Sequence, residues 1–184
     1  DQKQHLELAR DIAERFNGLY GKTFTVPEPY IASSQGGGKI MSLSDPTKKM
    51  SKSDENPNAC VLLLDSKDDI IRKFKRAVTD SDTVVRYADG KDGINNLMSI
   101  YSCFTGKSFD EIEKEFEGRG YGDFKMAVGE SVVEMLRPIR EETERLLADK
   151  AYLETVYRAG AEKASYVANR TVSKVYKKVG FLAR

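Results

Sequence analysis

Lys49 and Lys52 stand three residues apart on the short segment Lys49-Met50-Ser51-Lys52-Ser53, which we call the lysine loop. Ammonium groups, hydroxyls and backbone N–H groups that converge on such a turn bind phosphate oxygens well. Cations placed there also stabilise the negative charge that spreads over a departing pyrophosphate, without any acid or base. Segments rich in Lys and Ser occur in solvated linkers too. We interpret the loop as a polyphosphate clamp, with Lys49 and Lys52 as its cations and Ser51 and Ser53 as hydroxyl donors.

Two segments ahead of the loop carry weaker signals. Asp1 and Gln2 place a carboxylate and an amide at a helix start, where they can bond hydroxyls or an ammonium group, or can simply suit the helix dipole. Gly36-Gly37-Gly38-Lys39 has half of a phosphate-binding P-loop, but Ser33 replaces the first glycine and Ile40 replaces the final Ser or Thr. We therefore reject a P-loop and expect a flexible hinge ahead of the lysine loop.

Charge is unevenly spread, although the net charge is only +1. Residues 110–149 hold twelve acidic and six basic residues, whereas residues 158–184 hold seven basic residues and one acidic residue. Four of these C-terminal cations fall on the outward face of an expected helix: Arg170, Lys174, Lys177 and Lys178. This face is either a solvated amphipathic surface or a contact for nucleic-acid phosphates.

Several function classes are excluded by residue counts. His5 is the only histidine, so a metal site built from several histidines cannot form within these residues. Cys60 and Cys103 are too few for a disulfide framework or a zinc site. No apolar run approaches the roughly 20 residues that span a bilayer, and no signal peptide opens the chain. We expect no bound metal, no membrane contact and a cytoplasmic location.

The elements that must position these residues are mainly helical by pattern. Toward the N-terminus we expect a helix over residues 4–17, closed by Gly18 and Gly21, and a loop over 22–38. A short strand over 39–43 should deliver the lysine loop, and residues 60–64 should form a buried strand or turn.

Five helices are expected after these elements. The first begins at Ser66, and the second spans 94–104 and stops before Gly106. The third runs from a Ser108–Glu111 capping box to Gly118. The fourth covers 123–148, with a kink or division at Pro138, and the fifth spans 161–179, with an Ala/Val stripe facing inward.

The flanks of the lysine loop carry a family resemblance. Asp45-Pro46-Thr47-Lys48 before it and Asp54 after it make the segment similar to the KMSKS loop of class I aminoacyl-tRNA synthetases. Further blocks resemble the bacterial tryptophanyl-tRNA synthetases, in family order over essentially the whole chain. These blocks are Asp1–Leu8, Arg10–Ala13, Ile40–Leu43, Ala77–Ser81, Val85–Tyr87, Asn95–Leu97, Phe116–Gly118, Gly120–Gly122 and Gly160–Ala164.

The resemblance implies a fold and a reaction. Residues 1–64 would form the C-terminal edge of a Rossmann-like α/β catalytic domain, with one helix, a short strand and the KMSKS loop. Residues 65–184 would form an all-helical bundle that receives the anticodon region of tRNA. The reaction implied is ATP-dependent activation of L-tryptophan to tryptophanyl-adenylate and pyrophosphate, with Mg²⁺ accompanying the nucleotide, followed by transfer to tRNA(Trp). A homodimer is implied as well.

The resemblance also implies roles for particular residues. Asp1 would contact ATP at the ribose, Gln2 the tryptophan substrate, and Ile40 would touch ATP through its backbone. The ATP phosphates would be held by the lysine loop: Lys49, Met50, Ser51, Lys52 and Ser53. The tRNA backbone would lie on the basic C-terminal face: Arg170, Lys174, Lys177 and Lys178.

The chain departs from the family pattern in two places. The stretch from Ser33 to Gly38 looks longer and richer in glycine than the usual loop, and the HIGH-type ATP-binding motif is absent from these residues. We therefore expect the chain to be the C-terminal half of the enzyme, unable to activate tryptophan alone. Two alternatives stay open: a tyrosyl-tRNA synthetase, and a non-catalytic helical RNA-binding module.

Overall fold

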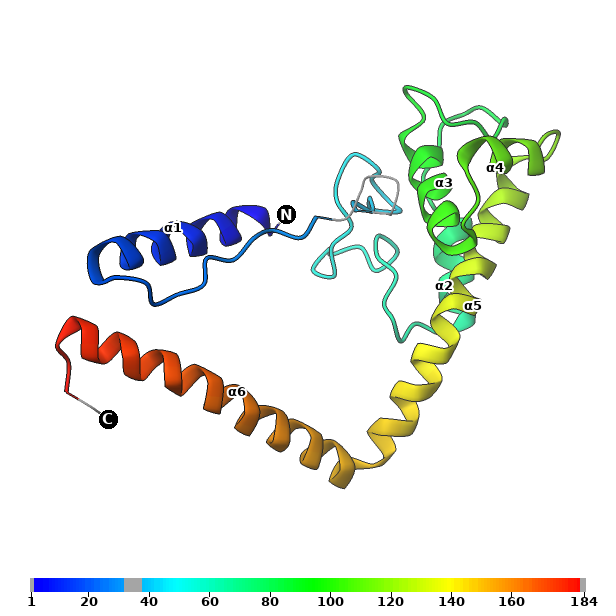
Figure 1. The fold of residues 1–184 in the computed structure, drawn as a ribbon. Helices are drawn as coiled ribbons and strands as arrows, with labels where there is room; N and C mark the ends of the chain where they lie inside the picture. The colour runs from blue at the N-terminus through cyan, green and yellow to red at the C-terminus, as the bar shows by residue number, and fades with distance from the viewer. Residues whose placement is uncertain (1, 32–37, 183–184) are drawn as a thin grey trace. The chain divides into compact units, whose positions relative to one another are not determined.

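A computed structural model of the chain describes residues 2–31 and 38–182 (Figure 1). It contains six α-helices: α1 (Lys3–Tyr20), α2 (Lys67–Lys75), α3 (Asp92–Thr105), α4 (Phe109–Glu115), α5 (Tyr121–Ala148) and α6 (Lys150–Val179). The expectation of a mainly α chain is confirmed. The expected strand over 39–43 is wrong, since within the described ranges the only β pairing is an isolated antiparallel bridge between Met41 and Lys49.

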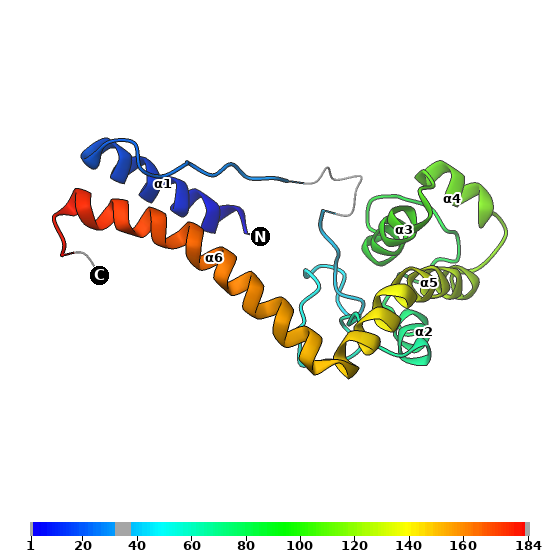
Figure 2. The same cartoon turned by 60° about the horizontal axis from the view of Figure 1, so that its bottom comes forward.

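The chain divides into two units, which we describe separately. Unit 1 combines Asp1–Ile31 with Leu146–Arg184, and unit 2 is the continuous segment Ala32–Arg145. Unit 2 holds the lysine loop and helices α2 to α4 with most of α5, whereas unit 1 holds α1 and α6 (Figure 2).

Local signals fix several helix ends in unit 2. The Ser66 side chain accepts a hydrogen bond from the Asp69 N–H and caps α2. Ser108 and Glu111 form the expected capping box at the start of α4, and the two hydrogen bonds to the Ser108 N–H and hydroxyl hold the pKa of the Glu111 carboxyl below its usual range. Gly106 ends α3 in the left-handed conformation, where a residue without a Cβ meets no steric penalty.

The hydrophobic core of unit 2 lies among α2 to α5. Its aromatic centre consists of Tyr101, Phe116 and Phe124, whose rings meet edge to face with centroids 4.9 to 5.9 Å apart. The largest fully buried side chains around it come from all four helices and their joints: Ile70, Phe74, Ile94, Leu97, Met98, Ile112 and Val128. Because its buried side chains pack in this core, α3 is a rigid support for the polar side chains that it also carries.

Helix α5 continues through Pro138 as one helix of 28 residues, so the expected division at this proline is wrong. Pro138 removes one backbone donor from the helix but does not end it. The Arg140 side chain, half a turn further on, donates to the Asp65 carbonyl (3.1 Å) ahead of α2. Packing of the α5 surface against unit 2 thus outweighs the local cost of the proline.

Unit 1 buries little of its apolar surface. Ala13 is the only described residue of α1 that is buried, and no described residue of α6 is. The expected inward face of the last helix is therefore wrong for Ala161, Ala164, Ala168 and Val172, which are exposed, whereas Val175 and Val179 are half-buried. Near the C-terminal end of α6, a side chain also bonds to the segment after α1. There Lys178 Nζ donates to the carbonyls of Gly21 (2.9 Å) and Lys22 (3.2 Å).

The end of α1 is held by its own side chains. Asn17 Oδ1 accepts from the N–H groups of Thr23 (2.8 Å) and Phe24 (2.9 Å), and its amide donates to the Phe24 carbonyl. Gly18 remains inside the helix, and Gly21 follows it with φ +77°, so the helix ends later than the first expected glycine. Over residues 2–31 and 38–182, no helix combines the length and apolar character that crossing a bilayer requires.

Candidate functional site

The lysine loop begins on a narrow hairpin in unit 2. Met41 and Lys49 face each other as the single bridged pair. Two backbone hydrogen bonds flank this pair, from the N–H of Ser42 to the carbonyl of Lys48 (2.8 Å) and from the N–H of Met50 to the carbonyl of Ile40 (3.0 Å). This is the non-hydrogen-bonded type of antiparallel pair, so the peptide groups of Met41 itself point away from Lys49.

The base of the hairpin is tied to the helical core. The N–H of Leu43 donates to the Ala59 carbonyl (3.0 Å), and the Leu43 carbonyl accepts from the N–H of Val78 (2.8 Å). Met41 is held by the Asn96 side chain of α3, whose Oδ1 accepts from the Met41 N–H (2.9 Å) and whose Nδ2 donates to the Met41 carbonyl (2.9 Å). Asn96 is 6% exposed. These contacts fix where the loop leaves the protein.

Met50 divides the loop into an inner and an outer side. Met50 and Ile40 are half-buried and pack against the core of unit 2, at the edge of an apolar hollow of about 330 Å³. The hollow is lined entirely by apolar side chains and one thiol: Ile40, Met50, Val61, Leu63, Phe74, Ile100, Cys103, Phe104, Val132 and Leu136. The Met50 side chain thus anchors the loop by burial of a flexible thioether.

The outer side of the loop presents its polar groups to solvent. Lys49, Ser51, Lys52 and Ser53 are all exposed. Ser51 Oγ accepts from the N–H of Ser53 (3.2 Å), and the Ser51 carbonyl accepts from the N–H of Asp54 (3.3 Å). The backbone N–H groups of Ser51 and Lys52 donate to no other group in the described part of the chain. Two ammonium groups, hydroxyls and available N–H donors therefore share one short exposed turn, which suits a polyphosphate.

Lys48, just before the loop, pairs with an acidic neighbour. Its ammonium group lies 3.0 Å from Asp45 Oδ2. The Thr47 hydroxyl also donates to Asp45 Oδ1 (2.6 Å). The hydrogen bond from Thr47, followed by that from Lys48, holds the pKa of the Asp45 carboxyl below its usual range. Asp45 thus closes the turn that leads into the loop and offsets the charge of Lys48.

Gln2 belongs to unit 1, whereas the lysine loop belongs to unit 2. Gln2 is exposed, precedes α1 and offers its carbonyl to the Leu6 N–H (3.2 Å), while its side chain makes no capping hydrogen bond. Its amide is thus available to a ligand. The predicted ATP contact of Asp1 lies outside the described residues, as do Gly36 and Gly37 of the expected hinge.

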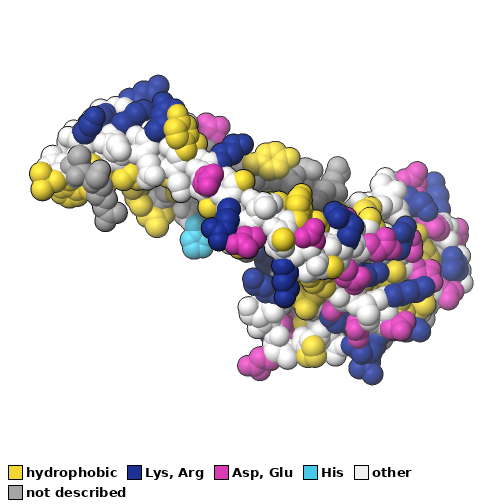
Figure 3. All heavy atoms as spheres, turned by 90° about the horizontal axis from the view of Figure 1, so that it is seen from below, with side chains coloured by type: hydrophobic (Ala, Val, Ile, Leu, Met, Phe, Trp, Pro, Cys, Tyr) yellow, Lys and Arg dark blue, Asp and Glu magenta, His cyan; other side chains and the backbone are white. Residues whose placement is uncertain are grey.

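The basic face of α6 has an aromatic residue at one end. Arg170, Lys174 and Lys177 line a shallow hollow with Tyr166, Asn169 and Ser173. The Arg170 guanidinium lies 5.9 Å from the centre of the Tyr166 ring. Lys178, by contrast, is used in the contact with the end of α1. Lys and Arg side chains gather along one edge of unit 1, while charges of both signs are interspersed over unit 2 (Figure 3).

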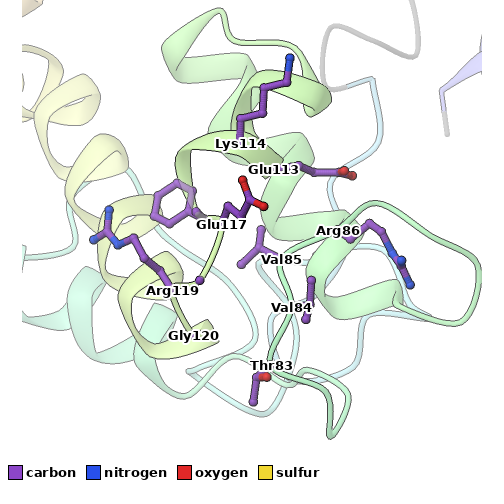
Figure 4. Close-up of a pocket in the computed structure, with 11 residues that line it drawn as sticks. Thr83, Val84, Val85, Arg86, Glu113, Lys114, Glu117, Arg119 and Gly120 are labelled. Atoms are coloured by element: carbon purple, nitrogen blue, oxygen red, sulfur yellow. The ribbon is translucent and has the colours of Figure 1, made fainter.

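A hollow of about 600 Å³ in unit 2 holds no residue that the sequence identified as a site (Figure 4). It lies between the extended segment 83–86 and the residues from Glu113 to Gly120. Its charged lining is mixed, with Arg86, Lys114 and Arg119 beside Glu113 and Glu117. Glu113 accepts from the Tyr87 N–H (2.8 Å), and the Arg119 guanidinium lies over the Phe116 ring. Such a lining does not favour a polyphosphate.

No cluster of three His, Cys, Asp or Glu side chains in the described ranges is arranged to hold a metal ion. Cys60 and Cys103 are free thiols, and burial raises the pKa of the Cys60 thiol. Cations and hydroxyls, rather than metal-binding carboxylates, make up the lysine loop.

Comparison with known families identifies the sequence pattern. The family model described as "tRNA synthetases class I (W and Y)" matches residues 1–137. The tryptophan–tRNA ligase of Clostridium tetani is 54% identical over 182 residues, which are 99% of this chain and 53% of that protein. The tryptophan–tRNA ligase of Wolinella succinogenes is 52% identical over 182 residues, 99% of this chain and 55% of that protein. The chain spans about half the length of the curated relatives it matches.

Solved structures give the same grouping. A tryptophanyl-tRNA synthetase from Mycoplasma pneumoniae matches with a TM-score of 0.81 at 29% identity, over 98% of this chain and 54% of that chain. The Campylobacter jejuni enzyme, crystallised with ADP and tryptophan, matches with a TM-score of 0.68 at 29% identity, over 98% of this chain and 55% of that one. A tyrosyl-tRNA synthetase from Aeropyrum pernix matches with a TM-score of 0.52 at 27% identity, over 86% and 45% of the two chains.

Proposed function

We propose a function for this chain from one premise: it belongs to the class I tRNA synthetases of the tryptophan and tyrosine family. The full-length protein that contains this chain is a tryptophan–tRNA ligase. That protein activates L-tryptophan with ATP to give tryptophanyl-adenylate and pyrophosphate, then transfers the tryptophanyl group to tRNA(Trp). Relatives more than half identical over nearly the whole chain bear this name, which favours tryptophan over tyrosine.

The chain supplies the C-terminal part of this enzyme. Residues 1–64 belong to the catalytic domain and carry the lysine loop, and residues 65–184 form the helical domain that receives the anticodon region of the tRNA. The HIGH-type motif and most of the indole pocket belong to the remaining half of the protein. The enzyme works as a cytoplasmic homodimer, and Mg²⁺ reaches it bound to the nucleotide.

The lysine loop handles the phosphates of ATP. In the first step, the tryptophan carboxylate attacks the α-phosphorus, the bond from that phosphorus to the bridging oxygen breaks, and the electron pair leaves with pyrophosphate. Lys49 and Lys52, with the Ser51 and Ser53 hydroxyls, stabilise the charge on this leaving group. The observation that carries the proposal is the exposed polar edge of the loop, held in place by the half-buried Met50 side chain that packs against the core.

Other groups position the substrates. Asp1 contacts the ATP ribose and Gln2 contacts tryptophan. Ile40, whose carbonyl accepts from the Met50 N–H, contacts ATP through its backbone. Arg170, Lys174, Lys177 and Lys178 contribute sequence-independent contacts to tRNA phosphates.

The experiment compares Lys49→Ala and Lys52→Ala with Lys48→Ala in the full-length enzyme. We expect kcat of tryptophan-dependent ATP–pyrophosphate exchange to fall by about 10²- to 10³-fold in the first two variants, as for the loss of one charge-stabilising donor. Lys48→Ala removes an adjacent cation that Asp45 already engages and should leave the exchange rate close to that of the wild type.

Binding constants for tryptophan complete the test. The affinity for tryptophan should stay near its original value in all three variants, because the loop contacts the nucleotide. Normal exchange in both Lys49→Ala and Lys52→Ala would refute the proposed role of the loop and favour a non-catalytic RNA-binding module. Normal activation combined with weakened tryptophan binding would refute it as well.

A further inference from the structure

Adjacent asparagines on α3 make the same kind of contact with two different backbone segments. Asn96 grips Met41 at the base of the lysine loop, and Asn95 grips Ala88. The Ala88 N–H donates to Asn95 Oδ1 (3.1 Å), and Asn95 Nδ2 donates to the Ala88 carbonyl (2.7 Å). Each side-chain amide thus pairs with both peptide groups of one residue, as a neighbouring strand would.

From this geometry we propose that Asn96 is a positioning residue for the lysine loop, setting the place of Lys49 and the following residues through Met41. The inference rests on the proposed function of the loop in handling ATP phosphates. Asn96 touches neither the loop lysines nor, in this proposal, the substrate. It acts through the backbone of the hairpin.

The first step concerns what Met41 needs. In the bridged pair with Lys49, the N–H and carbonyl of Met41 point away from the loop segment. The neighbouring residues Ser42 and Leu43 are buried, so water is a poor substitute partner at this place. Asn96 satisfies both groups with 2.9 Å hydrogen bonds. Only its oxygen can accept and only its nitrogen can donate, which fixes the orientation of the amide.

The second step concerns what holds Asn96. It lies on α3 beside Ile94, Leu97 and Met98, all of which are at most 1% exposed. A side chain on such a helix has little freedom, which is the condition for holding a functional loop in place. Ser42 and Ile40 then pass this position to Lys48 and Met50 through the two flanking hydrogen bonds.

The third step concerns the loop beyond the hairpin. From Ser51 to Glu55 every described residue is exposed, and the hydrogen bonds of Ser51, Ser53 and Asp54 stay within this short stretch or with Asn56. This outer stretch therefore takes its position from the hairpin at its base and from the Met50 side chain. A shift there of about 1 Å can cost on the order of 10²-fold in rate for a reaction that depends on placed charges.

Asn95 provides the matched control, since Asn95→Ala removes the same amide from the same helix but releases Ala88. In the full-length enzyme, we expect Asn96→Ala to lower kcat of tryptophan-dependent ATP–pyrophosphate exchange by about tenfold or more. The KM for tryptophan should stay within about threefold of the wild type. Asn95→Ala should keep both constants within about threefold. A purely structural role would move the two variants together.

Hydrogen exchange of backbone amides gives a readout that does not depend on activity. Asn96→Ala should speed the exchange of the Met41, Ser42 and Met50 amides by about tenfold or more, because local opening of these bonds becomes easier. Asn95→Ala should speed the exchange of the Ala88 amide and leave those three unchanged. Lys49→Ala and Lys52→Ala, measured in parallel, report on the function of the loop itself.

The outcomes separate the two proposals. A normal kcat in Asn96→Ala, or an equal loss in Asn95→Ala, overturns the positioning role. If the two lysine variants retain the full rate of ATP–pyrophosphate exchange, the proposed function of the loop fails. Amide hydrogen exchange then decides the positioning role on its own: an unchanged rate at Met50 in Asn96→Ala overturns it, and a faster rate supports it. Should Asn96→Ala not fold, Asn96→Asp keeps the acceptor for the Met41 N–H, loses the donor and places a carboxylate oxygen against the Met41 carbonyl. A kcat in that variant equal to that of the wild type overturns the role, and a partial loss supports it.

Discussion

Replacing Gly93 with alanine tests how closely α3 packs on the segment behind the lysine loop. A Cβ atom at this position would lie 2.2 Å from the Val78 carbonyl oxygen and 3.0 Å from the Thr79 Cα. Ordinary contacts between carbon and a carbonyl oxygen begin at roughly 3.3 Å, so the two backbones must separate by about 1 Å. The obstacle is a main chain, which cannot turn aside as a flexible side chain can.

The expected cost follows from this overlap. Overpacking a filled core costs about 1–3 kcal/mol, and a clash with backbone belongs at the upper end, near 2–3 kcal/mol. For a chain of this size, that lowers the thermal midpoint by roughly 5–10 °C. The Val78 N–H also donates to the Leu43 carbonyl, next to the hairpin that bears the loop. Displacement of Val78 should therefore lower the ATP–pyrophosphate exchange rate of the full-length enzyme as well.

Gly122→Ala is the matched control, because nothing lies within 4 Å of a Cβ at that position in α5. Its free energy of unfolding should change by no more than about 0.5 kcal/mol. Thermal unfolding followed by circular dichroism measures both variants. If Gly93→Ala and Gly122→Ala unfold at the same temperature, the packing of α3 on Val78 and Thr79 is wrong.

Two further predictions concern charge. The Lys91 ammonium, 2.6 Å from Asp82, lowers the pKa of that carboxyl from 3.8 to about 2, so its contribution to stability is complete above pH 3.8 and is lost as the pH falls toward 2. The difference in urea midpoint between wild type and Lys91→Met should thus shrink over this window, and a constant difference would contradict the assignment. On α6, the Lys174→Ala/Lys177→Ala double variant should weaken tRNA binding and reduce the slope of log affinity against log salt concentration by about 1–2. The control is Lys163→Ala, which lies outside the hollow lined by Lys174 and Lys177 and should change the affinity and the slope less. An unchanged slope in the double variant would exclude phosphate contacts there.

Much of the helical framework was predictable because its signals are local. The capping box of Ser108 and Glu111 and the left-handed Gly106 need only residues within a few positions of the helix end. At Pro138 the sequence left a kink and a division open, and the structure excludes only the division. Whether a proline ends a helix depends on how the helix surface packs, which residue spacing does not contain.

Two buried lysines show a second limit of prediction from the sequence. Lys73 is 5% exposed and pairs with Asp65, while Lys91 is 8% exposed among Asp80, Asp82 and Tyr121. Sequence patterning assigns lysines to the solvated face, since an unpaired ammonium is costly to bury. What permits burial here is a set of partners eight to thirty positions away, and no periodicity reveals such a set.

The expected strand over residues 39–43 failed in an informative way. Its apolar residues and its position before the loop are typical of a strand, and the backbone around Met41 does have partners on both sides. On the hairpin side the bonds come from Ser42 and Ile40, which flank Met41. On the other side both peptide groups of Met41 bond to a side chain 55 positions away, Asn96. A strand pattern predicts that peptide groups need partners, and it cannot say that an amide from a helix will supply them.

The lysine loop was predicted as a set of ATP contacts in which Met50 stood beside the lysines and serines. The structure separates these residues by direction: the Met50 side chain packs against the core, while Lys49, Ser51, Lys52 and Ser53 remain exposed. Composition alone explains why cations and hydroxyls suit phosphate, but it does not explain an apolar residue between them. Burial of Met50 holds the turn by a flexible side chain, and the Asn96 amide holds the adjoining hairpin by directed hydrogen bonds. Since charge stabilisation depends on where the ammonium groups stand, the apolar residue and the distant asparagine belong to the design of the site as much as the lysines do.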